Sequence, residues 1–85
     1  MSAFDEVWIR IQRFAGEPFH QARGKEFAYS VREGFVKPTT SSLAISYNAF
    51  ELAFGRRPIE APGKLKDIEG ASYLYAILTD PRISP

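Results

Sequence analysis

The most apolar stretch of this 85-residue chain is Gly70-Ala71-Ser72-Tyr73-Leu74-Tyr75-Ala76-Ile77-Leu78-Thr79-Asp80-Pro81. When successive residues turn by about 100°, as in an α-helix, one broad arc of the stretch collects Ala71, Tyr73, Leu74, Tyr75, Ile77 and Leu78. The opposite side holds Ser72, Ala76 and Thr79. The spacing predicts a helix with a wide buried stripe, and we expect the rest of the chain to fold against it.

The ends of this helix are marked by residues with known preferences. A serine hydroxyl accepts hydrogen bonds from the free amides of a first helical turn, so Ser72 is the predicted N-cap. Pro81 disfavours the helical conformation at Asp80, so the helix is predicted to end there or just before. Aromatic side chains at helical spacing usually belong to a core, and we therefore interpret the tyrosines as core residues rather than as a cofactor pocket.

Composition limits the classes of protein to which the chain can belong. Apolar residues make up 45% of it, enough for one hydrophobic core, so residues 1–85 are predicted to form a single domain. No apolar run approaches the length of about 20 residues that a membrane span needs. The acidic N-terminus lacks the apolar centre of an export signal, so we expect a cytoplasmic protein. The absence of cysteine excludes disulfides and thiolate metal sites.

Alternation of apolar and polar residues predicts strands in the first half of the chain. Residues 6–14 are predicted to form a strand that turns Val7, Ile9 and Ile11 to one face of a sheet. The other face of the same strand would carry Trp8, Arg10, Gln12 and Phe14. Residues 19–24 fit either a short strand or an ordered loop, and residues 43–45 predict one more short strand.

The clearest local prediction is a β-hairpin between residues 25 and 37. Phe27, Tyr29 and Val31 alternate with polar residues, and Glu33-Gly34 supplies a tight turn into the next strand. Glycine adopts the positive φ that such turns need without a steric penalty. Either Phe35 or Val36 would then point away from the core.

A second helix is predicted after residue 45. Ser46 or Asn48 can cap its start, Gly55 suits its end, and Pro58 prevents its continuation. Strands followed by helices indicate an α+β fold, with a small antiparallel sheet of three to four strands followed by two helices packed on one face. A small winged-helix arrangement is the alternative, and it is less favoured because the hairpin precedes the helices.

Three segments carry a resemblance to known sequences. Residues 19–31, 45–54 and 70–83 are similar to short, uncharacterised bacterial proteins of unknown function, which are often carried on mobile or accessory DNA. The resemblance implies a bacterial, cytoplasmic protein. It implies no activity and no functional residue.

His20 is the only histidine, and an unperturbed histidine is the side chain that titrates near neutral pH. With Arg23, Lys25 and Tyr29 nearby in the sequence, a small phosphodiesterase site can be imagined, but a structural or exposed histidine is the simpler interpretation. One histidine, no cysteine and dispersed carboxylates provide no metal-ligand spacing. No phosphate-binding or dinucleotide motif is present, so we expect no enzyme, metal or cofactor.

Two binding hypotheses remain, and both use the predicted sheet. In the first, which we favour, the chain is an interaction module that forms a homodimer or docks on a protein partner by burying Trp8, Phe14 and Ala28. In the alternative, Trp8 stacks on a base of a nucleic acid and the phosphates contact Arg10, Arg13, Arg23, Lys25, Arg32 and Lys37. The formal net charge of only +1 predicts weak, salt-sensitive nucleic-acid binding.

Overall fold

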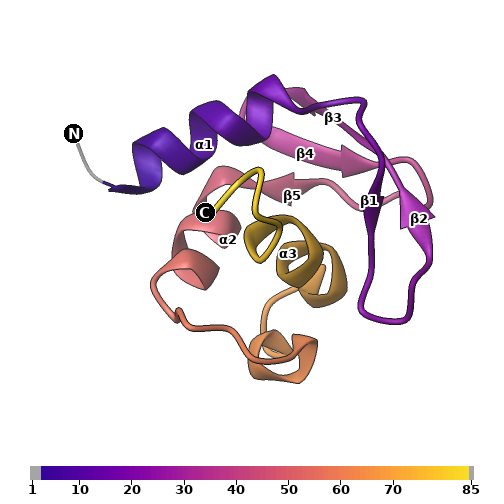
Figure 1. Cartoon of the computed structure of the whole chain (residues 1–85). Helices are drawn as coiled ribbons and strands as arrows, with labels where there is room; N and C mark the ends of the chain where they lie inside the picture. The colour runs from indigo at the N-terminus through magenta and orange to yellow at the C-terminus, as the bar shows by residue number, and fades with distance from the viewer. Residues whose placement is uncertain (1–2, 85) are drawn as a thin grey trace.

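The computed structural model describes residues 3–84 and has an α+β fold with three α-helices and two small antiparallel sheets. Figure 1 shows the elements along the chain. In order they are α1 (Ala3–Arg13), β1 (Phe19–His20), β2 (Glu26–Phe27), β3 (Tyr29–Arg32), β4 (Phe35–Pro38), β5 (Ile45–Ser46), α2 (Tyr47–Phe54), the 3₁₀ helix η1 (Pro62–Leu65) and α3 (Ala71–Leu78). None of the helices in residues 3–84 has the length and apolar character that crossing a membrane requires.

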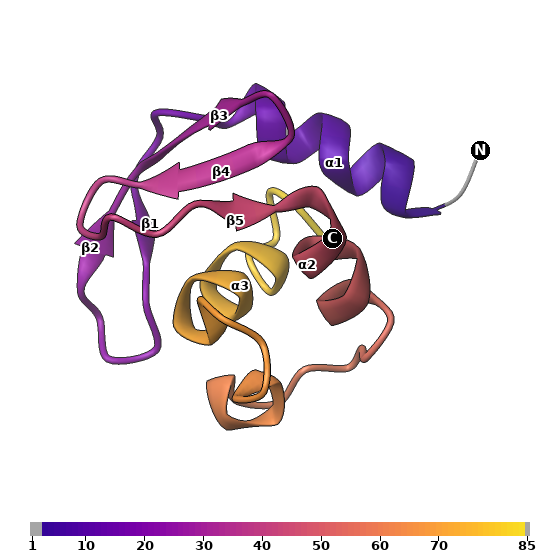
Figure 2. The same cartoon turned by 180° about the vertical axis from the view of Figure 1, so that it is seen from behind.

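The predicted hairpin is confirmed. β3 and β4 pair antiparallel, with Arg32 opposite Phe35 on either side of the turn. The turn residues Glu33 and Gly34 have φ of 53° and 81°, the left-handed values that a two-residue hairpin loop needs. β4 also pairs with β5 and lies in the middle of a three-stranded sheet, as Figure 2 shows from behind, while β1 and β2 form a separate two-stranded sheet.

The predicted strand over residues 6–14 is wrong, because this segment is the helix α1. Phe4, Val7 and Ile11 are buried at a spacing of three and four residues, while Ile9, which the strand would have buried, is 47% exposed. Val7 and Ile11 suit both a period of two and a helical period, so the pattern alone does not discriminate. Charge does favour the helix: Asp5 and Glu6 lie in its first turn, and basic residues lie in its last turn.

Ser46 caps α2, which decides between the two expected capping residues. Its hydroxyl accepts a hydrogen bond from the backbone N–H of Ala49 at 3.1 Å, and its own backbone is extended. The helix ends at Phe54 with Gly55 as the C-cap residue, as expected, although Gly55 keeps a right-handed φ of −66°. Of the strand expected at residues 43–45, only Ile45 pairs with β4, and the strand continues to Ser46.

The C-terminal helix is confirmed as α3, but two of its details were wrong. The residue at its N-cap is Gly70, with φ of 85°, so Ser72 lies inside the first turn and does not cap it. Ala76, which was expected on the exposed side, is buried with 6% of its surface accessible. The short helix is buried over more of its circumference than a surface helix, because η1, α2 and β1 all pack against it.

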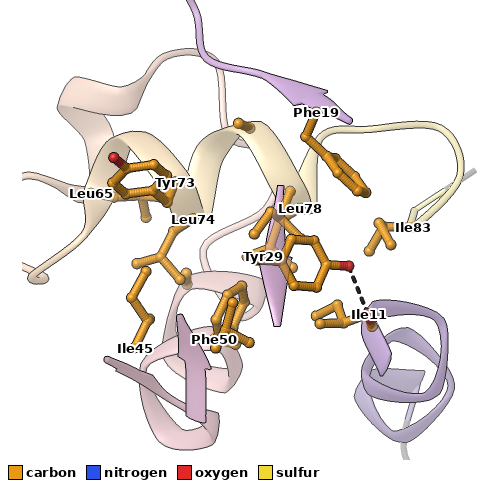
Figure 3. Packing of buried hydrophobic residues seen from close by; sticks show 14 of the residues in the cluster. Ile11, Phe19, Tyr29, Ile45, Phe50, Leu65, Tyr73, Leu74, Leu78 and Ile83 are labelled. Atoms are coloured by element: carbon orange, nitrogen blue, oxygen red, sulfur yellow. Dashed lines mark hydrogen bonds between the residues drawn. The ribbon is translucent and has the colours of Figure 1, made fainter. Parts of the chain in front are cut away.

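One hydrophobic core joins the three helices to the buried faces of the sheets. Figure 3 shows Leu74 and Leu78 of α3 beside core residues of the strands and of α2. The hydroxyl of Tyr29 crosses to α1 and donates a hydrogen bond to the backbone carbonyl of Ile11. The expectation of a sheet followed by helices therefore omits α1, whose apolar side belongs to the same core.

Candidate interaction surface

The side of the β3–β4–β5 sheet that faces away from the core carries four exposed side chains, and we call it the outer sheet face. Successive residues of a strand point to opposite faces, and directly opposed residues share a face. Tyr29, Val36 and Ile45 are buried, so the residues next to them point outward. The exposed set consists of two cross-strand pairs, Ser30 with Lys37 and Arg32 with Phe35.

Phe35 is the distinctive residue of the outer sheet face. It is 44% exposed, one of three large apolar side chains that remain exposed in residues 3–84. Arg32 lies opposite it, at the distance where cross-strand side chains interact, and Lys37 follows on the same side of β4. Sequence reasoning placed either Phe35 or Val36 outward, and the register of β4 decides for Phe35.

The charge of the outer sheet face is positive. Arg32 and Lys37 supply two cations, and the outward positions of the described strands β3, β4 and β5 include no carboxylate. Glu33 lies beside this face, in the hairpin turn. An exposed aromatic ring between cations suits a partner that combines negative charge with an apolar group.

Trp8 does not lie on the sheet, because it belongs to α1. Its ring is half-buried and makes edge contacts with Tyr47 and Phe50, with centroids 5.0 and 5.9 Å apart, and a tilted contact with Phe4. The exposed sheet position on which its predicted role depended does not exist, since the segment is helical. The chain itself covers part of the indole, with residues of α2.

The other two interface candidates are also half-buried away from the outer sheet face. Phe14 follows α1, and the guanidinium of Arg82 lies 5.8 Å from its ring centroid. Ala28 lies between β2 and β3, where both of its backbone groups are bonded to Thr39. The structure therefore does not bring Trp8, Phe14 and Ala28 together on one sheet face.

The six basic candidates fall in three separate regions: the end of α1, the turn between β1 and β2, and the outer sheet face. Arg10 and Arg13 lie in the last turn of α1, where Arg10 donates a hydrogen bond to the carbonyl of Ile83 at 3.3 Å. Two more, Arg23 and Lys25, lie in the turn between β1 and β2. Only Arg32 and Lys37 share the outer sheet face, so the structure does not join the six into one stripe.

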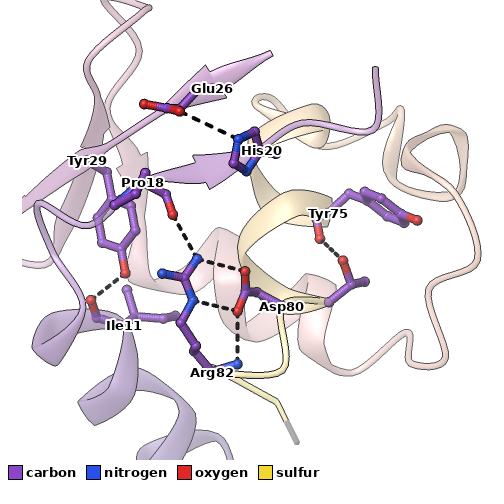
Figure 4. Close-up of polar contacts among 9 residues, drawn as sticks. Ile11, Pro18, His20, Glu26, Tyr29, Tyr75, Asp80 and Arg82 are labelled. Atoms are coloured by element: carbon purple, nitrogen blue, oxygen red, sulfur yellow. Dashed lines mark hydrogen bonds and ion pairs between the residues drawn. The ribbon is translucent and has the colours of Figure 1, made fainter. Parts of the chain in front are cut away.

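His20 pairs across the β1–β2 sheet with Glu26. Its Nε2 lies 3.6 Å from the Glu26 Oε1, and both side chains are more than half exposed. Figure 4 shows the contact between the two side chains. Across residues 3–84 there is no group of three or more histidine or acidic residues that could hold a metal ion.

Arg82, which sequence reasoning did not single out, fastens the end of the chain. Its guanidinium pairs with Asp80 at 2.9 Å and donates to the carbonyl of Pro18 at 2.8 Å (Figure 4). It also lies 4.0 Å from the ring centroid of Phe19. The hydrogen bonds from Arg82 hold the pKa of the Asp80 carboxyl below its usual range. Because every one of these contacts is internal, we assign Arg82 to the fold rather than to a binding surface.

Comparison with known proteins finds no matching family model, no matching curated protein and no matching solved structure.

Proposed function

We propose that the chain is a non-catalytic binding module whose outer sheet face docks onto an acidic segment of a partner protein. The observation that carries the proposal is the Arg32–Phe35 pair, an exposed aromatic residue directly opposite a cation on an otherwise polar face. In this proposal α2 and α3 cover the opposite face of the sheet. The partner is another bacterial, cytoplasmic protein, in keeping with the resemblance of the sequence to short bacterial proteins.

Charge favours a different partner over a second copy of the same chain. A twofold dimer brings the same patch of both copies together. Arg32 and Lys37 of one copy would then face the same cations of the other, and the face has no carboxylate to pair with them. An acidic peptide avoids this repulsion, and an apolar residue within it can cover the exposed ring of Phe35.

Single-stranded nucleic acid is the competing partner class, because a base can stack on Phe35 while phosphates pair with the two cations. The arrangement of the basic residues disfavours it, since four of the six lie on other elements. Each phosphate contact with a single strand adds about 0.7 to the slope of log K against log salt. Contacts with Arg32 and Lys37 alone would therefore give a slope of only about 1.4 in magnitude, which means weak electrostatic binding.

The test is a binding titration with three fluorescent probes: a peptide of alternating Glu and Leu, the same peptide with Gln in place of Glu, and a thymidine oligonucleotide. We expect the acidic peptide to bind more tightly than the other two. Phe35→Ala and Arg32→Gln should each weaken it by about tenfold, the usual loss for a central interface residue. The matched controls, Leu52→Ala on α2 and Arg13→Gln on α1, should leave it unchanged.

Other outcomes assign a different function. Equal binding of the acidic and neutral peptides, or an unchanged affinity in Phe35→Ala, contradicts the proposal. Tighter binding of the oligonucleotide, lost in Phe35→Ala, replaces the protein partner with a nucleic acid. A dimer mass in light scattering that falls to a monomer mass in Phe35→Ala shows self-association instead.

A further inference from the structure

A cavity of about 450 Å³ lies between the turn that joins β1 to β2 and the start of α3. Its volume is in the range of small-molecule sites, about 300–1,000 Å³. The lining consists of Gln21, Ala22, Arg23, Pro62 and Ser72. None of these residues belongs to the outer sheet face, so the cavity is independent of the proposed docking surface.

The first wall of the cavity is an ordered turn. The N–H of Gln21 donates to the carbonyl of Lys25 at 2.9 Å, and the N–H of Gly24 donates to the carbonyl of Gln21 at 2.7 Å. Gly24 has φ of 87°, a left-handed value that glycine adopts without a steric penalty, so the chain can reverse direction between Gln21 and Lys25. These hydrogen bonds order the backbone of the turn, which positions Gln21, Ala22 and Arg23 along the cavity.

The second wall is formed by Pro62 of η1 and Ser72 of α3. A polar contact between Gln21 and Ser72, which are 51 residues apart in the sequence, joins the two walls. The amide Nε2 of Gln21 donates to the hydroxyl of Ser72 at 3.4 Å, a long hydrogen bond. Ser72 is free for this contact because Gly70, and not Ser72, occupies the N-cap of α3. A bound polar group can replace this weak bond with a shorter bond to either side chain.

The charge of the lining is that of Arg23 alone. Its guanidinium has five N–H donors, and within residues 3–84 it forms no salt bridge and no side-chain hydrogen bond. Within the described residues, Arg56 and Arg82 already have acidic partners. A single unpartnered guanidinium beside the carbon surface of Ala22 and Pro62 matches one carboxylate on an apolar body.

We propose that this cavity is a binding site for a small organic monoanion, a carboxylate attached to a compact apolar group. The carboxylate pairs with Arg23 and accepts hydrogen bonds from the Ser72 hydroxyl or the Gln21 amide. The apolar group packs against Ala22 and Pro62. Because the walls are distant in the sequence, such a ligand bridges the β1–β2 turn to α3 and η1.

The test uses benzoate as the probe and benzamide, which has the same shape without the charge, as its neutral counterpart. Binding is followed by the shifts of backbone amide resonances in the full chain. We expect benzoate to shift the amides of residues 21–23 and 72, and benzamide to bind at least about tenfold more weakly, the loss of one charge-assisted hydrogen bond. Inorganic phosphate, which lacks the apolar group, should also bind more weakly.

Variants locate the site. Arg23→Gln should weaken benzoate binding by about tenfold, and Ser72→Ala by a few fold. Lys25→Gln, which removes a cation from the same turn but outside the lining, should bind benzoate like the unchanged chain. Arg23 is exposed and unpartnered, so its substitution should leave the thermal midpoint unchanged.

Three results would overturn the proposal. The first is the absence of any benzoate-induced shift at these amides. The second is equal binding of benzoate and benzamide, or of benzoate and phosphate. The third is an equal loss of affinity in Lys25→Gln and Arg23→Gln, which would show attraction to the general charge of the turn.

Discussion

The hydroxyl of Tyr29 on β3 donates a 2.6 Å hydrogen bond to the backbone carbonyl of Ile11 in α1. Because α1 ends at Arg13, no later helical amide bonds to this carbonyl, and the tyrosine satisfies it. Burial raises the pKa of the Tyr29 phenol, so the hydroxyl keeps its proton and remains a donor at neutral pH. One buried contact therefore fastens the N-terminal helix to the hairpin.

Tyr29→Phe should lower the free energy of unfolding by about 1–3 kcal/mol, because it leaves the buried Ile11 carbonyl without its donor. In a domain of this size each kcal/mol corresponds to about 4–8 °C in the thermal midpoint. Tyr75→Phe is the matched control, since Tyr75 is only half-buried, and it should change stability by less than about 0.5 kcal/mol. Thermal unfolding followed by circular dichroism measures both, and equal midpoints would contradict the assigned role.

Leu78→Ala should lower the free energy of unfolding by about 2–5 kcal/mol, because it opens a cavity in the middle of the core. Leu78 is 2% exposed, whereas Leu52 on α2 is 54% exposed. Leu52→Ala makes the same chemical change and should cost less than about 0.5 kcal/mol. Urea unfolding compares the two, and an unchanged midpoint in Leu78→Ala would show that α3 is not central to the core.

Gly70→Ala should destabilise the protein more than Gly24→Ala. Both glycines have positive φ, 85° and 87°, so each substitution costs about 1–2 kcal/mol for the left-handed backbone. Only at Gly70 would the added Cβ meet a neighbour, the Cδ1 of Ile45 at 2.8 Å. Adding Ile45→Val, which removes that methyl group, should recover part of the difference, and no recovery would place the strain elsewhere.

Asp67 should titrate well below an ordinary aspartate. Two hydrogen bonds from Arg56, at 2.6 and 2.7 Å, lower the pKa of the Asp67 carboxyl to about 2. Because the folded pKa lies below the unfolded value of 3.8, the pair stabilises the fold above about pH 4 and loses this contribution as the pH falls towards 2. An NMR titration should find the midpoint near 2, and Arg56→Gln should return it towards 3.8; an unchanged midpoint in that variant would contradict the pairing.

The sequence determined the elements whose signals are local. The hairpin of β3 and β4 follows from two alternating runs around Glu33-Gly34, since the turn sets the register without help from distant residues. The C-terminal helix follows from its apolar arc and from Pro81, which stops it. Ser46 was recognisable as one of two candidate caps, because a serine hydroxyl acts on a backbone amide only three residues away, and the structure selected it over Asn48.

Only the tertiary structure decided the remaining features, because they depend on which surfaces meet. Val7 and Ile11 suit a strand as well as a helix, and α1 is settled by packing that leaves Ile9 exposed and covers Trp8 with residues of α2. Local periodicity does not show which face of a hairpin the core will cover, so the outward position of Phe35 became definite only because the core covers the face of β4 that carries Val36. The cavity beside Arg23 joins residues about 50 positions apart, and no local pattern encodes that contact.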